Sequence, residues 1–227
     1  MKVGIVGGTG DIGEGIAMRL SSRHDVIIGS REEEKAAQSS ACCLDTLRKR
    51  GLPCSCQGHT NQEAVDRSDV IILAIPFKHV EPTLATLKGL SGKIVISPVN
   101  PMEKREYFMF VPPPEGSAAL MIRRLIPPDA RLCTAFNTVA ANKWRALDEE
   151  LDLAIPVCGD DPDAKAVVME LINSVPRVRA YNAGPLAASC MVECLTPLLL
   201  NIARFNKMRD VGIDRKSTRL NSSHPVL

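Results

Sequence analysis

The sequence predicts an α/β protein, a Rossmann-type, doubly wound parallel sheet with a small, mainly helical C-terminal lobe. Three observations predict this class. Short runs rich in Val and Ile alternate with longer amphipathic segments, which is the order of a sheet with helices on both faces. The run at residues 69–76 has almost no polar alternation, as expected of a strand buried on both sides. A glycine-rich turn at residues 7–13 follows the first apolar run.

The first part of the chain is expected to alternate strands with helices. The expected strands are residues 2–7, 25–30, 54–58, 69–76 and 92–101. The expected helices are residues 13–23, 31–51, 61–68 and 78–90. Gly51 closes the second helix, because glycine is favoured directly after a helix end. This order indicates parallel strands joined by helical crossovers.

A long surface loop is expected at the start of the second part. Residues 101–117 hold a cluster of prolines, which neither continue a helix nor donate a hydrogen bond within a sheet. A helix at 118–126, a strand at 130–139 and a helix at 140–147 are expected to follow.

Two further segments complete the expected fold. Residues 153–175 predict a strand, a turn and a helix, with Asp160 or Asp161 capping the helix and Pro162 in its first turn. Residues 189–206 predict an apolar helix interrupted by a proline. That helix is hydrophobic all round, so we expect it to be buried rather than on the surface.

Composition and charge narrow the classes of partner. With 227 residues, the chain can bury one sizeable core, or one core with a small appended lobe. The last fourteen residues hold three Lys or Arg and one Asp, and the rest carries 25 basic and 25 acidic residues. Because residues 1–213 carry no excess charge, we expect neither nucleic-acid binding nor membrane binding through a polybasic surface. No segment approaches the ~20 continuous apolar residues of a membrane span, and no secretory signal is visible.

The eight cysteines are expected to be reduced structural thiols. A disulfide scaffold is not expected in a chain of this length without an export signal. The stretch from Cys42 to Cys56, followed by His59, raises a zinc site as the alternative. Its adjacent and alternate cysteines do not match the two-residue gap of usual ligand pairs, so no metal is predicted.

The turn GGTGDIG has the spacing G-x-G-x-x-G at Gly8, Gly10 and Gly13. In a dinucleotide-binding turn the first glycine permits the tight turn, the second lets the backbone approach a pyrophosphate, and the third allows close packing of helix on strand. The helix N-terminus adds free amides and a partial positive charge. The motif follows an expected strand and precedes an amphipathic helix, and this context distinguishes it from a glycine-rich turn without a ligand.

The next strand lacks the acidic residue that binds the ribose 2′-hydroxyl of NAD about 20 residues after such a turn. It ends instead in Ser30 and Arg31, with Lys35 one helical turn later. A hydroxyl, a guanidinium and an ammonium group would hold a 2′-phosphate through charge-assisted hydrogen bonds. The sequence therefore predicts NADP as the cofactor. The alternative is that Arg31 and Lys35 are solvated and pair with the glutamates at 32–34.

Other candidate residues follow later strands. Pro76 and His79 come just after a buried strand, at the sheet edge where a nicotinamide should lie, although a surface histidine that caps a helix is the alternative for His79. Asn137 and Thr138 end another strand. They either line the pocket or form a turn whose polar groups are hydrogen-bonded within the protein. Trp144 is expected in the core. No Ser–His–Asp set and no acid–base carboxylate pair is evident, so no catalytic side chain is predicted.

Four stretches carry a family resemblance: GGTGDIGEG, GSREEEKA, IPVCGDD and AGPLAASCMVECLTPLLLNIARFNKMRDVGI. They span nearly all of residues 1–213, and on them the chain resembles the NADPH-dependent oxidoreductases of the deazaflavin coenzyme F(420). The resemblance implies a cytoplasmic enzyme, a homodimer or larger homo-oligomer, that transfers a hydride reversibly between NADP and the deazaflavin, with the two rings stacked in one cleft. Such a transfer needs positioning and exclusion of water more than a protein acid or base.

The motifs described above and the resemblance together predict which residues contact the two small-molecule cofactors, with Gly8, Gly13 and Pro76 coming from the motifs alone. Those expected to bind NADP are Gly8, Thr9, Gly10, Asp11, Ile12, Gly13, Ser30, Arg31, Lys35, Ile75, Pro76, His79, Val99 and Ala140. Those expected to line the deazaflavin cleft are Asn137, Val139, Thr196 and Leu199. The chain departs from the family in FNTVAA, where it has Asn137 and no proline in place of a histidine and a proline. The cysteine-rich stretch and the loop EKREYFMFVPPPEG also differ.

The sequence leaves two alternative functions open. NADPH-dependent reductase domains that use flavin and pass electrons to iron have a related Phe-Asn at the corresponding strand end, so a flavin or ferric reductase is the first alternative. A noncatalytic NADP-sensing module is the second. Asn137, Thr196 and the apolar C-terminal helix argue against it, because a sensor needs no second ring-binding cleft.

Three parts are expected along the chain. Residues 1–155 are expected to form the NADP-binding Rossmann domain and residues 156–213 a small lobe that completes the second cofactor cleft. Residues 214–227, DRKSTRLNSSHPVL, lie outside the resemblance, are polar and lack periodicity. We expect them to be a disordered tail and a non-native remnant.

Overall fold

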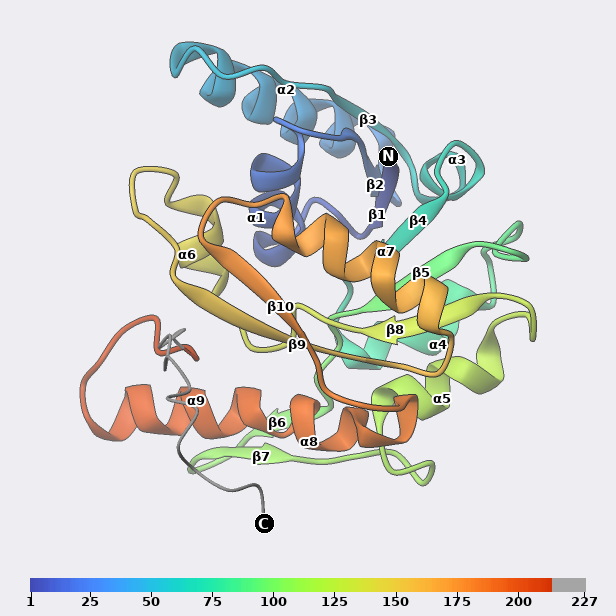
Figure 1. Ribbon diagram of the computed structural model, residues 1–227, viewed down its shortest axis with the longest axis vertical. Coiled ribbons are helices and arrows are strands. Elements are labelled where there is room, and N and C mark those ends of the chain that lie inside the picture. Colours follow the sequence, from blue (N-terminus) through green and yellow to red (C-terminus); the bar gives the residue numbers. More distant parts are fainter. Residues whose placement is uncertain (214–227) are drawn as a thin grey trace, which may run out of the picture.

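The computed structural model describes residues 1–213 and contains an eight-stranded sheet with helices on both faces (Figure 1). The sheet strands are β1 (Lys2–Val6), β2 (Asp25–Ser30), β3 (Cys56–Thr60), β4 (Val70–Leu73), β5 (Ile94–Ser97), β8 (Arg131–Thr134), β9 (Leu153–Gly159) and β10 (Val178–Asn182). The helices are α1 (Asp11–Leu20), α2 (Glu33–Lys49), α3 (Asn61–Asp66), α4 (Val80–Leu84), α5 (Ala118–Leu125), α6 (Ala141–Arg145), α7 (Pro162–Asn173), α8 (Ser189–Glu193) and α9 (Leu195–Phe205). Two 3₁₀ turns are η1 (Phe77–His79) and η2 (Leu186–Ala188).

The strand order confirms the predicted α/β class. The order is β10-β9-β8-β5-β4-β1-β2-β3, and neighbouring strands are parallel except for the antiparallel pair β8–β9. β1 pairs with β2 on one side and with β4 on the other, so the chain reverses its winding direction there. In open sheets of this kind, ligands bind in the crevice at the carboxyl ends of the strands where the direction reverses.

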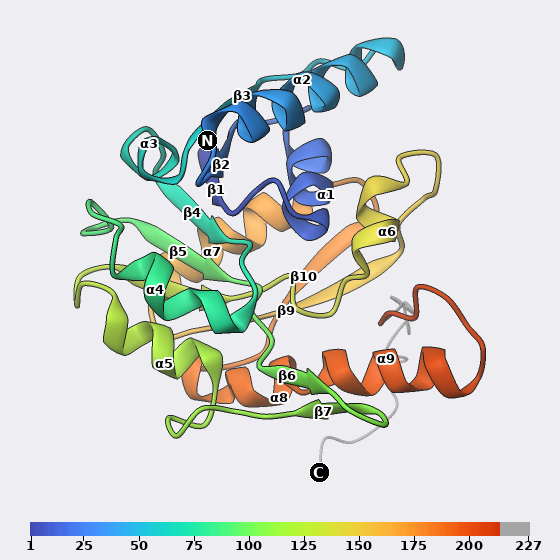
Figure 2. The same cartoon turned by 180° about the vertical axis from the view of Figure 1, so that it is seen from behind.

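The helices cover the sheet on both faces, as Figures 1 and 2 show from opposite sides. Residues of α1, α2 and α7 pack in one apolar core, and residues of α3, α4 and α5 pack in the other. In β4, Ile72 points into the first core while Ile71 and Leu73 point into the second, and all three are fully buried. Because each such side chain contributes about 1.5–3 kcal/mol on burial, this apolar run fixes β4 in the middle of the sheet.

The expected surface loop at 101–117 contains a short hairpin. β6 (Met102–Lys104) and β7 (Phe108–Phe110) pair antiparallel. The side chain of Asn201 on α9 accepts a hydrogen bond from the Phe108 amide at 2.8 Å and donates one to the Phe108 carbonyl at 2.8 Å. The hairpin is therefore fixed by a helix far along the chain, which its own charged and proline-rich sequence does not reveal.

The second lobe continues the same sheet. Its expected first residue, 156, lies inside β9, and β9 and β10 extend the sheet beyond β8. Asp161 caps α7, since its carboxylate accepts a hydrogen bond from the Ala164 amide at 2.7 Å. Asp160 instead accepts from the Leu186 amide at 2.8 Å. The division into 1–155 and 156–213 stays a prediction, and the expected disordered tail lies outside the described residues.

The apolar C-terminal helix lies on the surface, so the expectation that it is buried was wrong. It is broken at Cys194 into α8 and α9, and its proline lies in the first turn of α9, where the missing amide is tolerated. Four exposed apolar side chains follow one side of the two helices, and we call them the outer stripe: Met191, Leu198, Ile202 and Phe205. Phe205 is 68% exposed and Leu198 is 54% exposed.

The same segment, Leu186–Phe205, is long and apolar enough to cross a membrane, with a mean hydropathy of 1.7. From the sequence we had expected no segment long and apolar enough to span a membrane. Length and composition are weak evidence, because core helices of other proteins pass the same test. Glu193 and Arg204 within it also oppose a span.

Glu193 gives the fold a specific pH dependence. Its fully buried carboxylate accepts hydrogen bonds from the amides of Ala118 and Ala119 at 2.8 and 3.0 Å, at the start of α5. Burial outweighs these two bonds and raises the pKa of Glu193 from 4.5 to about 7. The folded state therefore holds this proton more tightly than the unfolded state does. The contribution of Glu193 to the free energy of unfolding is therefore fully present below about pH 4.5. It declines by about 3 kcal/mol as the pH rises to about 7.

Glu193→Gln is expected to flatten this decline, because the amide cannot ionise. Denaturant unfolding at pH 5 and pH 7.5 would compare the free energy of unfolding of the variant with that of the original chain. Glu106→Gln, which changes an exposed carboxylate, is the matched control. An unchanged slope in Glu193→Gln would assign the pH dependence to other groups.

Candidate functional site

Two cavities open at the carboxyl edge of the sheet. The first cavity, of about 560 Å³, lies between the glycine turn, the end of β2 and the segment after β4. The second cavity, of about 300 Å³, lies between the end of β8 and α9. Residues of the first cavity are Gly7, Thr9, Gly10, Ser30, Arg31, Glu32, Lys35, Asn61, Ala74, Ile75, Pro76, His79, Pro82, Thr83 and Thr86.

The three motif glycines have different structural roles. The Gly8 amide donates to the Gly29 carbonyl at 2.8 Å, which holds the turn against β2. A Cβ on Gly13 would lie 2.6 Å from the Cα of Gly8, so the fold itself needs glycine at position 13. Gly10 has φ −85° and ψ 164°, and a Cβ there would meet only the Gly7 carbonyl oxygen, at 3.7 Å. The fold would therefore tolerate a side chain at Gly10. The close approach of a ligand to the backbone would explain why glycine is present there.

The residues expected to bind a 2′-phosphate lie together in the first cavity. Ser30, Arg31 and Lys35 all line it, with Glu32 among them. The Lys35 ammonium pairs with the Glu32 carboxylate at 2.7 Å, as the alternative interpretation expected, and the two side chains are 59% and 63% exposed. Such an exposed pair contributes about 0–1 kcal/mol, so Lys35 is readily released to a ligand. Within residues 1–213, no ion pair is found for Arg31.

The segment after β4 supplies one wall of the first cavity. Ile75, Pro76 and His79 line it, from the end of β4 to η1. His79 precedes α4, but its side chain makes no capping hydrogen bond, so the helix-capping alternative is not found. Val99 is only 2% exposed and its side chain packs in the core. Its carbonyl accepts a hydrogen bond from Asn137 at 3.1 Å, so Val99 acts on the site through its backbone.

All four residues expected at the acceptor cleft line the second cavity. They are Asn137, Val139, Thr196 and Leu199, and Ile12 and Ala140 from the expected NADP set lie beside them. The Thr196 hydroxyl donates to the Asn137 carbonyl at 2.5 Å, and the Asn137 amide donates to Asn100 Oδ1 at 3.1 Å. The first bond ties the end of β8 to α9, and the second ties it to the segment after β5. Thr138, at 4% exposure, lines the same cavity.

Phe136 holds the backbone at this strand end in an unusual conformation. Its φ is +67°, in the left-handed region that side chains rarely adopt. The ring of Trp144 meets the ring of Phe136 edge-on, with 5.6 Å between centroids, and both are fully buried. Conformations of this kind cost about 1–3 kcal/mol and persist where the surroundings enforce them, commonly at functional sites. Phe136 lines the second cavity, which the sequence did not indicate.

Asp11 forms an ion pair with α6. Its carboxylate pairs with the Arg145 guanidinium of α6 at 2.7 Å, and the same guanidinium reaches Glu14 at 3.3 Å. The Asp11 side chain is 77% exposed, and Asp11 lines neither cavity, so its contact to NADP stays a prediction. The Arg145 pairs join α6, and with it the second cavity, to the helix that begins at the glycine turn.

Comparisons with known proteins agree with this geometry. The family model described as "NADP oxidoreductase coenzyme F420-dependent" matches residues 2–101. An "F420-dependent NADP reductase" of Methanocaldococcus jannaschii is 37% identical over 219 residues, which cover 94% of this chain and 97% of the relative.

Two further comparisons are more distant. A crystal structure of a protein assigned as an F420-dependent NADP reductase, from Arthrobacter, has a TM-score of 0.77 at 20% identity and covers 96% of this chain, which supports the fold. The rat metalloreductase STEAP3 is 29% identical over 201 residues, but these cover only 37% of that protein.

Proposed function

This chain belongs to the family of coenzyme F420-dependent NADP oxidoreductases, and from that premise we propose how its two cavities divide the reaction. The protein is an oxidoreductase that transfers a hydride between NADP(H) and the deazaflavin coenzyme. We assign NADP to the first cavity and the deazaflavin to the second. One observation carries this assignment: Thr9 and Gly10 line the first cavity and Ile12 lines the second, so the glycine turn lies between the two cavities.

The residues of the first cavity fit NADP. The open approach to Gly10 and the free amides at the start of α1 suit a pyrophosphate. Arg31, with Ser30 and Lys35, would hold the 2′-phosphate at the end of β2. Ile75 and Pro76 would border the nicotinamide half.

The residues of the second cavity fit a flat ring system. Ile12, Val139 and Leu199 give it apolar walls, while Asn137 and Thr196 fix the backbone around it. When bound, the nicotinamide supplies the hydride and the deazaflavin ring accepts it. The protein's part is to hold the two rings in one orientation and to exclude water between them.

The test is NADPH oxidation by the purified protein with oxidised deazaflavin coenzyme, beside flavin, ferric chelate and no-acceptor controls. Turnover with the deazaflavin alone is expected. Turnover with flavin or ferric chelate instead would favour the metalloreductase-like alternative, to which the similarity with STEAP3 points. Measurable NADP binding without turnover with any acceptor would favour the sensing module.

A homodimer or larger homo-oligomer is also part of the proposal. The outer stripe supports it, because its spacing of seven, four and three residues places four apolar side chains on one helical face, as in helices that pack on another helix. A different face of α9 lines the second cavity through Thr196 and Leu199. The cytoplasmic location stays a prediction.

Leu198→Asp combined with Phe205→Asp is expected to give monomers, because buried carboxylates on both copies would repel and lose their hydration. Sedimentation velocity over a range of protein concentrations measures the oligomeric state. Lys207→Asp, which places a carboxylate two residues beyond the same helix and outside the stripe, is the control. An oligomer that survives the double substitution would place the interface elsewhere.

A further inference from the structure

Asn61 lies beside the glycine turn but belongs neither to that turn nor to the Ser30-Arg31-Lys35 set. It is the first residue of α3, and its side chain lines the first cavity. We propose that Asn61 is a positioning and specificity residue, whose Oδ1 holds the glycine turn and whose Nδ2 donates a hydrogen bond to the 2′-phosphate of NADP. The proposal rests on the assignment of NADP to the first cavity.

The link to the glycine turn is direct. The Gly7 amide donates to Asn61 Oδ1 at 3.0 Å. Gly7 has φ +70°, and a Cβ there would lie 2.4 Å from the side chain of Ile75, so the fold needs glycine at this position. The hydrogen bond anchors the start of the turn to the first residue of α3.

This bond also fixes the orientation of the Asn61 amide. An amide N–H needs an acceptor, so Oδ1 faces Gly7 and Nδ2 must point the other way. Among residues 1–213, no acceptor is found for Nδ2, and it is not one of the enclosed polar atoms without a partner. Two N–H donors of Asn61 are therefore accessible at the wall of the first cavity.

The sheet register places these donors next to the 2′-phosphate residues. β2 and β3 are parallel, and Ser30 is paired with Thr60. Asn61 therefore follows β3 at the same level at which Arg31 follows β2. A 2′-phosphate held by Ser30 and Arg31 would present its remaining oxygens towards α3.

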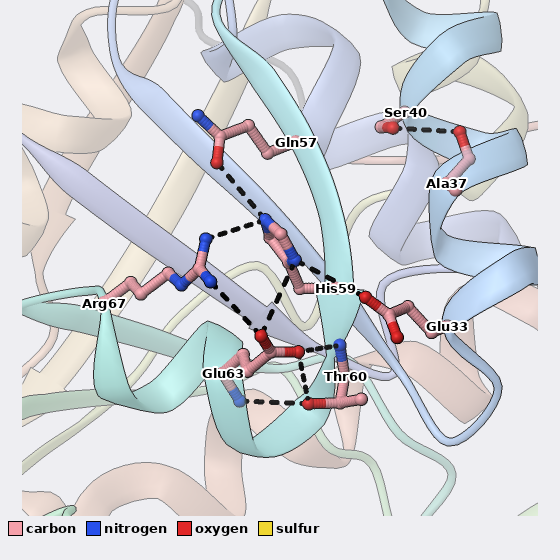
Figure 3. Close-up of polar contacts among 8 residues, drawn as sticks. All are labelled: Glu33, Ala37, Ser40, Gln57, His59, Thr60, Glu63 and Arg67. Atoms are coloured by element: carbon pink, nitrogen blue, oxygen red, sulfur yellow. Dashed lines mark hydrogen bonds and ion pairs between the residues drawn. The ribbon is translucent and has the colours of Figure 1, made fainter.

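A polar network around Thr60, the residue before Asn61, fixes the first turn of α3 (Figure 3). Thr60 and Glu63 form a capping box, in which the Glu63 amide donates to Thr60 Oγ1 and the Thr60 amide donates to Glu63 Oε2, both at 3.2 Å. Arg67 then contacts Glu63 Oε1 at 3.2 Å and His59 Nε2 at 2.9 Å. Capping boxes of this kind hold a helix start in one conformation, and here they set the position of Asn61.

The same network raises a metal site as an alternative role. Glu33, His59 and Glu63 lie close enough together to hold one ion. The Arg67 guanidinium already contacts His59 and Glu63 and supplies the positive charge at that place. We therefore interpret the cluster as support for α3.

Asn61→Asp separates the two roles in one substitution. The carboxylate keeps an acceptor for the Gly7 amide, loses the donor to the phosphate and adds a negative charge beside it. An acid in the first turn of a helix is favourable, so the variant should fold. The dissociation constants of 2′,5′-ADP and 5′-ADP, measured by calorimetry, are expected to rise about 10- to 100-fold for the first and less than about threefold for the second.

Asn61→Ala and Gln38→Glu complete the design. Asn61→Ala removes both roles and should weaken 2′,5′-ADP and 5′-ADP together. Gln38→Glu makes the same amide-to-acid change on the exposed side of α2 and should change neither. A selective loss of 2′,5′-ADP in Asn61→Asp supports the proposal. An unchanged affinity for 2′,5′-ADP, or an equal loss of both ligands, overturns it.

Failure of the cavity assignment is distinguishable from failure of the Asn61 role. If the original chain binds 2′,5′-ADP no better than 5′-ADP, the 2′-phosphate is not read here at all, and the assignment of NADP falls together with the proposal. If the original chain prefers 2′,5′-ADP and Asn61→Asp keeps that preference, only the role of Asn61 falls. Neither measurement depends on the electron acceptor.

Discussion

Replacing Arg31 with aspartate is expected to weaken NADPH binding by about 100-fold or more while changing NADH binding less than about fivefold. Arg31 lines the first cavity and makes no ion pair within residues 1–213, so its charge is available to a ligand. Hydrogen bonds to a charged group contribute about 1.5–3 kcal/mol each, and a guanidinium can make two to one phosphate. Aspartate removes these bonds and adds repulsion.

Equilibrium titration with NADPH and with NADH measures the two affinities separately. Arg31→Lys keeps the charge but loses the fork of donors, so an intermediate loss of NADPH affinity is expected. Arg48→Asp, at the far end of α2, makes the same charge change outside the cavity and serves as the control. Equal losses for both coenzymes in Arg31→Asp would mean that Arg31 does not recognise the 2′-phosphate.

Gly10→Ala is expected to reduce NADPH affinity by about 100-fold without harming the fold. Alanine adopts the backbone angles of Gly10 freely, and its Cβ would meet only one protein atom, at 3.7 Å. The free energy of unfolding should therefore change by less than about 1 kcal/mol. The added methyl group instead occupies the space through which a pyrophosphate approaches the backbone.

Gly13→Ala is the informative comparison, because it should do the reverse. Its Cβ would lie 2.6 Å from the Cα of Gly8, and the resulting strain is expected to destabilise the protein by about 1–3 kcal/mol or more. Denaturant unfolding and NADPH titration on both variants separate the two effects. Normal NADPH binding by a folded Gly10→Ala protein would show that no ligand approaches the backbone at Gly10.

The parts of the site that lie close together in sequence could be predicted from it. The glycine turn and the Ser30-Arg31-Lys35 set depend on local spacing after a strand, and the structure places them in one cavity. Asn61 and Asn100 were missed, because their roles come from strand pairing and from contacts to residues far along the chain. Nothing in the sequence around position 61 distinguishes a residue that anchors the turn from an ordinary helix start.

The C-terminal helix shows a different limit. Its apolar sequence correctly indicates that it packs against something, but hydrophobicity does not say whether the partner belongs to the same chain. Leu198 and Phe205 are exposed, while Thr196 and Leu199 face the second cavity. The hairpin β6–β7 was missed for a related reason, since its three-residue strands depend on Asn201 rather than on a strand-like pattern of their own.

The contact between Phe136 and Trp144 lets the intrinsic fluorescence of Trp144 report on the second cavity. Trp144 is the only tryptophan of the chain, is fully buried, and touches a ring that lines the second cavity. A conjugated ring bound in that cavity would lie one side chain away from the indole and quench its emission. Fluorescence would then follow occupancy of the second cavity in the absence of NADPH, so acceptor affinity can be separated from turnover without a label.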